Sequence, residues 1–203
     1  MHGQFFADEE TKPAASDTNT PKLTVETTGN HIYFYADVNS DRVLNLIKSI
    51  RELDAALRNE QLSRSIKEML PPTPIWLHVQ SNGGNLYAGF SFADQIATIK
   101  TPVYSIAEGC CASAATIISL ACTKRYAFPN SFMLIHQLRS IMWGSYEEFK
   151  DEMKIMDMLM DQMVAFYGKH TKMSTEEVRE LLKRDSWFNA IQCVEKGLVD
   201  EIL

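Results

Sequence analysis

Hydrophobic and polar positions along the chain follow two kinds of pattern. Short apolar runs, most of them bounded by Gly, Pro or Asn, predict strands at residues 23–27, 31–35, 75–80, 103–107, 125–128, 132–135 and 198–202. Longer stretches, mostly with apolar residues spaced by three and four, predict helices at residues 40–57, 86–99, 113–122, 145–167, 174–185 and 190–196. Strands therefore alternate with crossover helices, which is the order of right-handed βαβ units. The pattern predicts an α/β fold.

The longest apolar stripe lies in the second half of the chain. Ser145 and Glu148 have the spacing of a capping box, which predicts the start of a helix. Apolar residues then recur in steps of four and three, at positions 149, 153, 156, 160, 163 and 167. The stripe is rich in methionine, which favours packing over ligand binding. Its length suits contact with another subunit as well as with the core.

Two segments differ from the rest in composition. Residues 1–22 are polar and acidic and contain two prolines, so we expect a flexible N-terminal arm ahead of a single domain at residues 23–203. Residues 59–70 keep a helical pattern but are rich in charge, and Pro71 and Pro72 end that pattern. We expect a solvated extension there.

Composition narrows the kinds of partner. The chain has 203 residues, 45% of them hydrophobic, and a formal net charge of -6, which argues against nucleic acid or an anionic membrane as the main partner. No secretory signal is visible, and the most apolar window, 112–122, is too short to span a bilayer. We expect a cytoplasmic or equivalent reducing, soluble compartment.

The four cysteines, at positions 110, 111, 122 and 193, match no zinc-binding spacing. Neighbouring Cys110 and Cys111 cannot easily form a disulfide with each other. We expect all four to be reduced, buried, small apolar side chains, and we expect no metal site.

Two residues stand where chemistry is favoured. Ser113 lies where a strand passes into a helix of small residues, so a substrate can approach and exposed N–H groups favour a developing negative charge. A lone serine in such a helix is more often part of the core, and its importance depends on other residues. His136 ends the apolar strand 132–135. The other histidines, at positions 2, 31, 78 and 170, are expected to be structural or to face solvent.

Acyl transfer needs a nucleophile, a base, a carboxylate that orients the base, and donors for an oxyanion. Ser113, His136, an aspartate and the turn at 83–84 would supply all four. Spacing leaves the aspartate open, because the choice lies between Asp185 and three residues of a charged helix, Asp151, Asp157 and Asp161. The order Ser, His, Asp differs from that of chymotrypsin, subtilisin and the α/β-hydrolases, which indicates another scaffold.

Several separated motifs resemble those of one known family, the proteolytic subunit of the caseinolytic (Clp) protease, ClpP, a serine peptidase. They extend over residues 75–203, about two thirds of the chain, and comprise Asn82-Gly-Gly84, Gly109-Cys-Cys-Ala-Ser113, Pro129-Asn-Ser131, Ile135-His136-Gln137, Lys183-Arg-Asp185 and Glu195-Lys-Gly-Leu-Val-Asp200.

The resemblance implies a function for each site residue. Ser113 would be the nucleophile, His136 the general base and then the general acid, and Asp185 the orienting carboxylate. The backbone N–H groups of Gly84 and Ala114 would form the oxyanion hole. The implied fold is a crotonase-like (ClpP-type) spiral of ββα units with a projecting handle helix, here about 145–167.

The resemblance also implies partners. Family members stack two seven-membered rings, formed by copies of one subunit or by paralogous subunits, into a closed chamber. An AAA+ unfoldase uses ATP to deliver unfolded polypeptides, so this subunit would need no cofactor of its own. Substrate would bind as an added strand. Arg184 would connect ring assembly with alignment of the catalytic residues.

The sequence departs from the family pattern at several positions. Ser113 is followed by two alanines where the family has Met-Gly, which predicts a shifted cleavage preference. Leu138 replaces a proline, and residues 139–144 replace a glycine-rich strand that takes part in ring contacts and substrate pairing. Residues 59–73 form a longer and more charged insertion than the family shows.

The leading hypothesis is a serine endopeptidase subunit of an ATP-dependent Clp-type protease. The main alternative is a non-catalytic ClpP-like ring subunit that modulates a partner protease. A third reading is a crotonase-fold acyl-CoA enzyme, which shares a two-amide oxyanion hole but does not need the Ser-His-Asp set.

Overall fold

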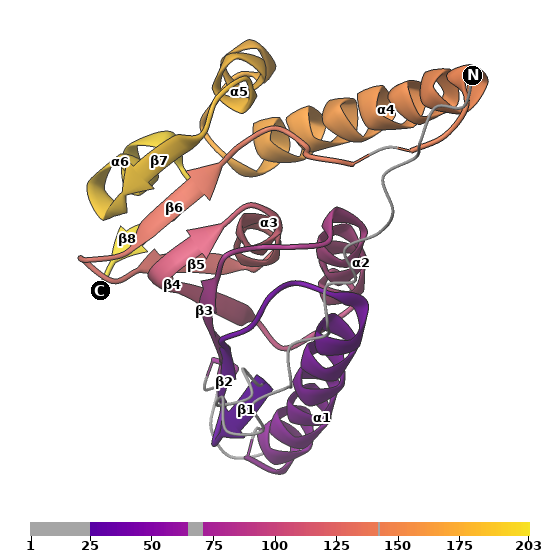
Figure 1. Cartoon of the computed structure of the whole chain (residues 1–203). Coiled ribbons are helices and arrows are strands. Elements are labelled where there is room, and N and C mark those ends of the chain that lie inside the picture. Colours follow the sequence, from indigo (N-terminus) through magenta and orange to yellow (C-terminus); the bar gives the residue numbers. More distant parts are fainter. Residues whose placement is uncertain (1–24, 65–70, 142) are drawn as a thin grey trace, which may run out of the picture.

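The computed structural model of the chain describes residues 25–64, 71–141 and 143–203 (Figure 1). The expected arm at 1–22 and part of the expected insertion at 59–73 lie outside these residues. The strands are β1 (Val25–Thr28), β2 (His31–Phe34), β3 (Ile75–Ser81), β4 (Val103–Ala112), β5 (Lys124–Ala127), β6 (Phe132–Ile135), β7 (Ser186–Asn189) and β8 (Glu201–Ile202). The helices are α1 (Ser40–Arg64), α2 (Leu86–Ile96), α3 (Ala114–Leu120), α4 (Tyr146–His170), α5 (Thr175–Leu182) and α6 (Ala190–Lys196).

The main sheet has the strand order β1-β2-β3-β4-β5-β8. Only β1 runs antiparallel to its neighbour, and the other pairs along this path are parallel, as expected for βαβ units. Helices α1, α2 and α3 cover one face of this sheet (Figure 1). Alternate residues of a strand face the same side, and Ile32, Phe34, Leu77 and Val79 are fully buried. The predicted α/β class is confirmed.

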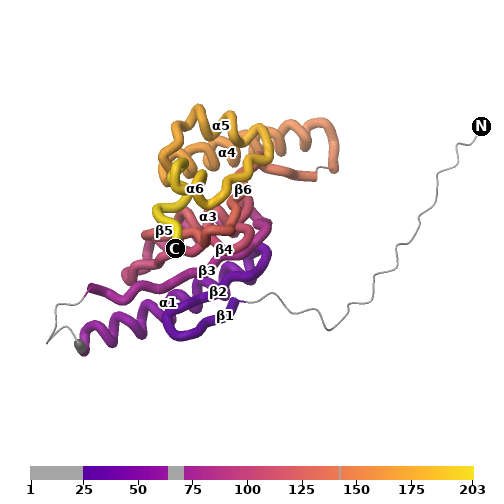
Figure 2. Tube along the Cα trace, turned by 90° about the vertical axis from the view of Figure 1, so that its left-hand side faces the viewer, coloured from indigo at the N-terminus to yellow at the C-terminus, as the bar shows by residue number. Residues whose placement is uncertain are grey.

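Strand β4 changes partner in its middle. Residues Tyr104–Ala107 pair with β5, whereas residues Cys110–Ala112 pair with β6, and Gly109 between them has a φ of +52°. Because β6 also pairs with β7, these strands lie with α5 and α6 in a second layer beside the main sheet (Figure 2). We expected the strand to end at Ala107 and a helix to follow. Small residues suit either structure, and pairing with β6 decides in favour of the strand.

Two other predictions at the C-terminus need correction. The segment Ser186–Asn189 is a strand, β7, that the pattern did not indicate, because four residues without clear alternation become a strand only by pairing with β6. The predicted strand at 198–202 is shorter, since only Glu201 and Ile202 pair with β5, while Leu198 and Val199 are buried below the end of α6.

Helix α4 begins as the capping box predicts and is three residues longer at its end than the expected 145–167. The Glu148 carboxylate accepts hydrogen bonds from the Ser145 N–H (2.6 Å) and hydroxyl (2.7 Å), which lower the pKa of Glu148. The apolar stripe then divides. Tyr167 and Met163 are buried, whereas Met153 is 50% exposed on the half that projects beyond the body of the molecule (Figure 1). The core therefore uses only the C-terminal half of the stripe.

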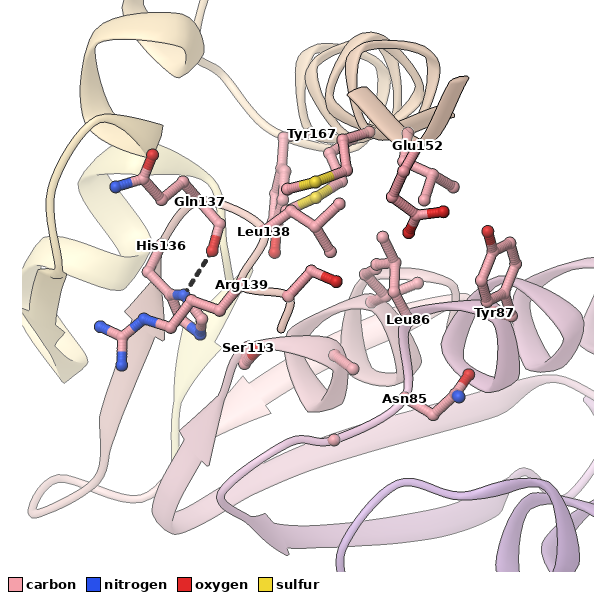
Figure 3. A pocket seen from close by; sticks show the side chains of 17 residues that line it. Asn85, Leu86, Tyr87, Ser113, His136, Gln137, Leu138, Arg139, Glu152 and Tyr167 are labelled. Carbon is pink, nitrogen blue, oxygen red and sulfur yellow. Dashed lines mark hydrogen bonds between the residues drawn. The ribbon is translucent and has the colours of Figure 1, made fainter. Parts of the chain in front are cut away.

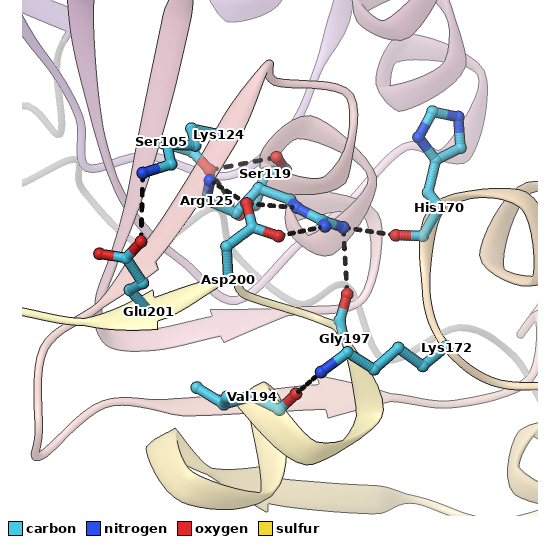
Figure 4. A network of polar contacts seen from close by, with 10 residues as sticks. All are labelled: Ser105, Ser119, Lys124, Arg125, His170, Lys172, Val194, Gly197, Asp200 and Glu201. Atoms are coloured by element: carbon cyan, nitrogen blue, oxygen red, sulfur yellow. Dashed lines mark hydrogen bonds and ion pairs between the residues drawn. The ribbon is translucent and has the colours of Figure 1, made fainter.

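Arg125 of β5 connects the ends of three other elements of secondary structure (Figure 4). Its Nη2 donates to Asp200 Oδ1 at 2.6 Å, and its Nε and backbone N–H donate to Asp200 Oδ2 at 3.3 and 2.8 Å. Its Nη1 donates to the carbonyl oxygens of Gly197 (3.0 Å) and His170. The end of α4, the end of α6 and the start of β8 are thereby joined to the main sheet.

Candidate active site

Ser113 is the residue between β4 and α3, and its backbone is strained. Its φ of 56° and ψ of -128° make it the only residue other than glycine with positive φ among the residues that the structure describes. Such a conformation costs about 1–3 kcal/mol and persists where the surroundings determine it. Here the Ser113 N–H donates to the Leu134 carbonyl (2.8 Å), and α3 begins immediately afterwards. The hydroxyl is thus carried on a sharp strand-to-helix turn.

The pairing of β4 with β6 brings His136 to the same end of the sheet as Ser113. The two strands are parallel, and their last paired residues are Ala112 and Leu134. Ser113 and His136 follow these residues by one and two positions, so both lie just past the carboxyl ends of neighbouring strands. The strand-end placement expected for His136 is what the structure shows.

The pairing of β6 with β7 brings in Asp185. These strands are antiparallel, and their terminal pair is Ile135 with Ser186. The next residues, His136 and Asp185, leave the two strands side by side. Residues directly opposite in an antiparallel pair are about 4.5–5.5 Å apart at Cα, so the backbone delivers both residues to one place. The unpredicted strand β7 is therefore what carries Asp185 to the site.

His136 has its ring oriented by a neighbour in sequence. The half-buried imidazole places Nδ1 2.6 Å from the carbonyl oxygen of Gln137 (Figure 3). Because a carbonyl oxygen can only accept, Nδ1 carries a proton, and in the neutral ring the lone pair then lies on Nε2. This is the tautomer that a general base needs.

Asp185 has a different partner. Nη2 of Arg139 donates to both carboxylate oxygens, at 2.8 and 2.7 Å. Both side chains are well exposed, by 68% for Arg139 and 49% for Asp185. Within residues 25–64, 71–141 and 143–203, no hydrogen bond joins Ser113 to His136 or His136 to Asp185. The backbone gathers the three residues, while two of the side chains bond elsewhere.

The turn at 83–84 lies directly against Ser113. A Cβ added at Gly83 would stand 2.6 Å from Ser113 Cβ, so only glycine fits this approach. The Gly83 carbonyl accepts from the Val38 N–H (2.8 Å), and the peptide that follows is trans. In a trans peptide the C=O and the next N–H point in opposite directions. The N–H of Gly84 therefore points away from Val38, and Gly84 lines the same cavity as Ser113.

Ala114 can provide a second backbone donor beside the serine. It is the first residue of α3, so its N–H has no acceptor within the helix. Ala114 also lines the cavity next to Ser113. Gly84 and Ala114 thus line the same cavity as Ser113 and can supply two backbone N–H groups to it.

A cavity of about 350 Å³ lies above these groups, between α3 and α4 (Figure 3). Ser113 and His136 lie on its wall near the two backbone donors. The remaining wall combines polar side chains with apolar ones. The apolar residues are Leu86, Tyr87, Ile117, Leu138, Met156, Leu159, Met163 and Tyr167, and the polar residues are Asn85, Gln137, Arg139, Ser140 and Glu152. The arrangement places the Ser113 hydroxyl, the His136 imidazole and the backbone of Gly84 and Ala114 around one space that can hold an apolar side chain.

No pattern in the sequence indicated the hydrogen-bonded contact that links Ser113 to α4. The Thr116 hydroxyl donates to the Ser113 carbonyl (2.6 Å) and lies 2.6 Å from the hydroxyl of Tyr167, which is 1% exposed. Burial raises the pKa of Tyr167 well above its ordinary value. The contact joins the handle helix to the serine turn. The pattern placed Tyr167 on the buried stripe but gave no sign of its partner.

A second polar chain lies on the other side of β3, away from the cavity. His31 Nδ1 is 2.9 Å from His78 Nε2, His78 Nδ1 is 2.5 Å from Glu108 Oε1, and Tyr35 donates to the other oxygen of Glu108. Burial and the neighbouring His78 lower the pKa of His31. The structural role expected for these two histidines agrees with this network.

Three of the cysteines, Cys111, Cys122 and Cys193, are buried as expected, while Cys110 is half-buried, and none forms a disulfide. Across the described part of the chain, no cluster of His, Cys, Asp and Glu has an arrangement that could hold a metal ion. No helix there combines the length and apolar character needed to cross a membrane.

Comparison with known proteins agrees with this geometry. The family model described as Clp protease matches residues 26–203. The chain is 37% identical over 153 residues to the ATP-dependent Clp protease proteolytic subunit 2 of Treponema denticola, covering 71% of this chain and 76% of that protein. It is 33% identical over 135 residues to proteolytic subunit 1 of Streptomyces coelicolor, covering 66% of this chain and 62% of that protein.

A solved structure gives a similar result. A mutant of ClpP1 from Listeria monocytogenes superposes with a TM-score of 0.72 at 25% sequence identity. The match covers 86% of this chain and 91% of that one, so the two share their fold over most of their length.

Proposed function

We propose, from the premise that this chain belongs to the Clp protease family, that it is a serine endopeptidase subunit of an ATP-dependent Clp-type protease. Its substrates are unfolded polypeptides, cleaved inside an oligomeric chamber. One observation carries the proposal: Ser113 and His136 line a single cavity, and Asp185 leaves the neighbouring strand beside His136.

The proposed reaction uses these residues in turn. His136 Nε2 takes the proton of the Ser113 hydroxyl as its oxygen attacks the carbonyl carbon of the peptide bond. The N–H groups of Gly84 and Ala114 donate to the resulting oxyanion. The imidazolium then protonates the leaving amine, and the C–N bond breaks to leave an acyl-enzyme. Water, deprotonated by His136, attacks this ester and releases the new carboxylate and the serine.

Helix α4, which corresponds to the expected handle helix, supports the proposal that the subunit assembles into an oligomer. Its projecting half presents exposed apolar side chains, including Met153 (50%) and Met158 (71%), which a second subunit would cover. We propose stacked seven-membered rings of this chain or of this chain with a paralogous subunit. An AAA+ partner would use ATP and deliver substrate, with no cofactor bound by this subunit.

One observation favours a second candidate. Asp185 bonds to Arg139 and not to His136. A ring subunit that modulates an active partner, without cleaving peptides itself, would have no need to hold Asp185 for His136.

Replacing Ser113 by alanine tests the proposal. We expect the assembled wild-type protein to hydrolyse fluorogenic peptides and to be labelled covalently by a fluorophosphonate, and we expect Ser113→Ala to lose both activities. Ser140→Ala is a matched control, because Ser140 lines the same cavity but has no part in the reaction.

Hydrolysis that persists in Ser113→Ala would refute the assignment of the nucleophile. An assembled wild-type protein that cleaves nothing, but alters the activity of a co-expressed active subunit, would establish the modulating function instead. Native mass measurement on the same samples reports the number of subunits and shows whether each variant assembles.

A further inference from the structure

The side chains around Asp185 point to a device that controls its availability. We propose that Arg139 is a positioning residue that competes with His136 for the Asp185 carboxylate, so that each catalytic cycle requires Asp185 to leave Arg139. This inference rests on the proposed serine peptidase function. It explains why the backbone brings Asp185 to His136 while the side chains are bonded to other groups.

The two residues that compete for the Asp185 carboxylate lie in one short segment. Arg139 follows His136 by three residues in the connection between β6 and α4, and both residues line the cavity. Asp185 stands opposite this segment, immediately before β7. A single carboxylate is therefore within reach of two cationic or potentially cationic side chains. The guanidinium holds it at present, through Nη2 on both oxygens.

His136 is left with the weaker acceptor. Its Nδ1 proton goes to the neutral Gln137 carbonyl, which fixes the correct tautomer. When the ring takes the serine proton and becomes positively charged, a carboxylate is a much better partner, because hydrogen bonds between ionised groups are about twice as strong as neutral ones. Transfer of Asp185 from Arg139 to His136 therefore stabilises the charged ring only when the reaction produces it.

The bond between Arg139 and Asp185 is weak enough to be exchanged. The two side chains are 68% and 49% exposed, and one nitrogen of the guanidinium makes both contacts. Exposed ion pairs shift an equilibrium by roughly 1.5- to 5-fold and weaken further as salt is added. Arg139 therefore retards the reaction by a modest factor that depends on ionic strength.

The test compares Arg139→Gln with Arg139→Lys in the assembled full-length protein. At low salt we expect Arg139→Gln to raise kcat for a fluorogenic peptide by about two- to fivefold with little change in KM. Arg139→Lys keeps the charge and should stay near the wild-type rate. The ratio of Arg139→Gln to wild type should approach one as salt is raised, a response that a purely structural role would not give.

Two further measurements make the test decisive. In a protein that already carries Asp185→Asn, the change Arg139→Gln should have no effect on kcat, because no carboxylate remains to compete for. The rate of fluorophosphonate labelling of the wild-type protein should rise with salt, which needs no variant to fold.

A kcat for Arg139→Gln at or below that of wild type at low salt overturns the inference. So does a wild-type labelling rate that stays constant or falls with salt. Failure of the proposed function looks different: wild type and Arg139→Gln would both assemble, and neither would be labelled at Ser113 nor cleave peptide.

Discussion

The chain contains two arginine–aspartate pairs near its C-terminal strands, and they differ in exposure and in the number of hydrogen bonds that the arginine makes. Arg125 and Asp200 are 16% and 32% exposed, and Arg125 uses its backbone N–H and three side-chain nitrogens to reach Asp200 and two carbonyl groups. Arg139 and Asp185 are 68% and 49% exposed and share contacts through one nitrogen.

The difference separates two uses of the same chemistry. Several hydrogen bonds at low exposure form a permanent connection, because removal of one partner leaves the others unsatisfied. One exposed contact leaves both partners solvated when it breaks, so the pair can be exchanged at small cost. We infer that the first pair holds the fold together and that the second serves the site.

The largest expected effect is a loss of activity on substitution of Asp185, which belongs to the more exposed pair. On the proposed mechanism, Asp185→Asn lowers kcat by about ten-thousandfold, as loss of the orienting carboxylate does in the worked serine-protease case, while stability changes by less than about 0.5 kcal/mol. Peptide hydrolysis and thermal unfolding of the same preparation check both parts. Turnover near the wild-type rate would show that the Gln137 carbonyl orients His136 by itself.

The next largest effect is a loss of stability on substitution of Arg125, which belongs to the less exposed pair. Arg125→Ala removes the side-chain donors to Asp200 and to the carbonyls of Gly197 and His170, and we expect a loss of about 3 kcal/mol in the free energy of unfolding. Arg139→Ala is the matched control and should cost less than about 1 kcal/mol. Urea unfolding measures both. Equal losses would contradict the distinction drawn between the two pairs.

The smallest expected effect is a dependence on pH. Burial alone would raise the pKa of Asp200, but hydrogen bonds from the Arg125 side chain and backbone outweigh it and lower that pKa. The contribution of Asp200 is then present above the unfolded pKa of about 3.9 and disappears as pH falls through the lower folded pKa. Asp200→Asn should therefore lose less stability than wild type between about pH 5 and pH 2.

Unfolding followed across this range checks the difference. In an Arg125→Ala background, Asp200 keeps only the backbone N–H of residue 125 as a donor, so its pKa is lowered less and Asp200→Asn should change the acid dependence by a smaller amount. A pH profile of Asp200→Asn that coincides with that of wild type would contradict the assignment.

Much of the fold follows from local pattern. The short apolar run at 75–80 before the turn at 81–84 identifies β3, and apolar spacing by three and four at 149–167 identifies α4. Ser113 and His136 could be proposed as site residues because Ser113 opens a helix of small residues and His136 ends an apolar strand, and both features are visible in the chain itself. Membership of the Clp protease family, suggested by separated motifs, is confirmed by the family match.

The rest depends on contacts between distant residues. β7 becomes a strand only beside β6, and β4 continues past Ala107 only because β6 pairs with it. The bond between Arg139 and Asp185 joins residues 46 positions apart, and the side chains themselves give no sign of it. The same holds for Thr116 and Tyr167. These features depend on how the layers pack, which local preference does not encode.

The change of partner within β4 has a mechanical consequence. Its first half is held by β5 in one layer and its second half by β6 in the other, with Gly109 as the bend between them. A shift of the β6–β7 layer must therefore be taken up within β4, immediately ahead of Ser113. A displacement of that layer would therefore act on the backbone of Ser113 itself, whose N–H is bonded to Leu134 of β6.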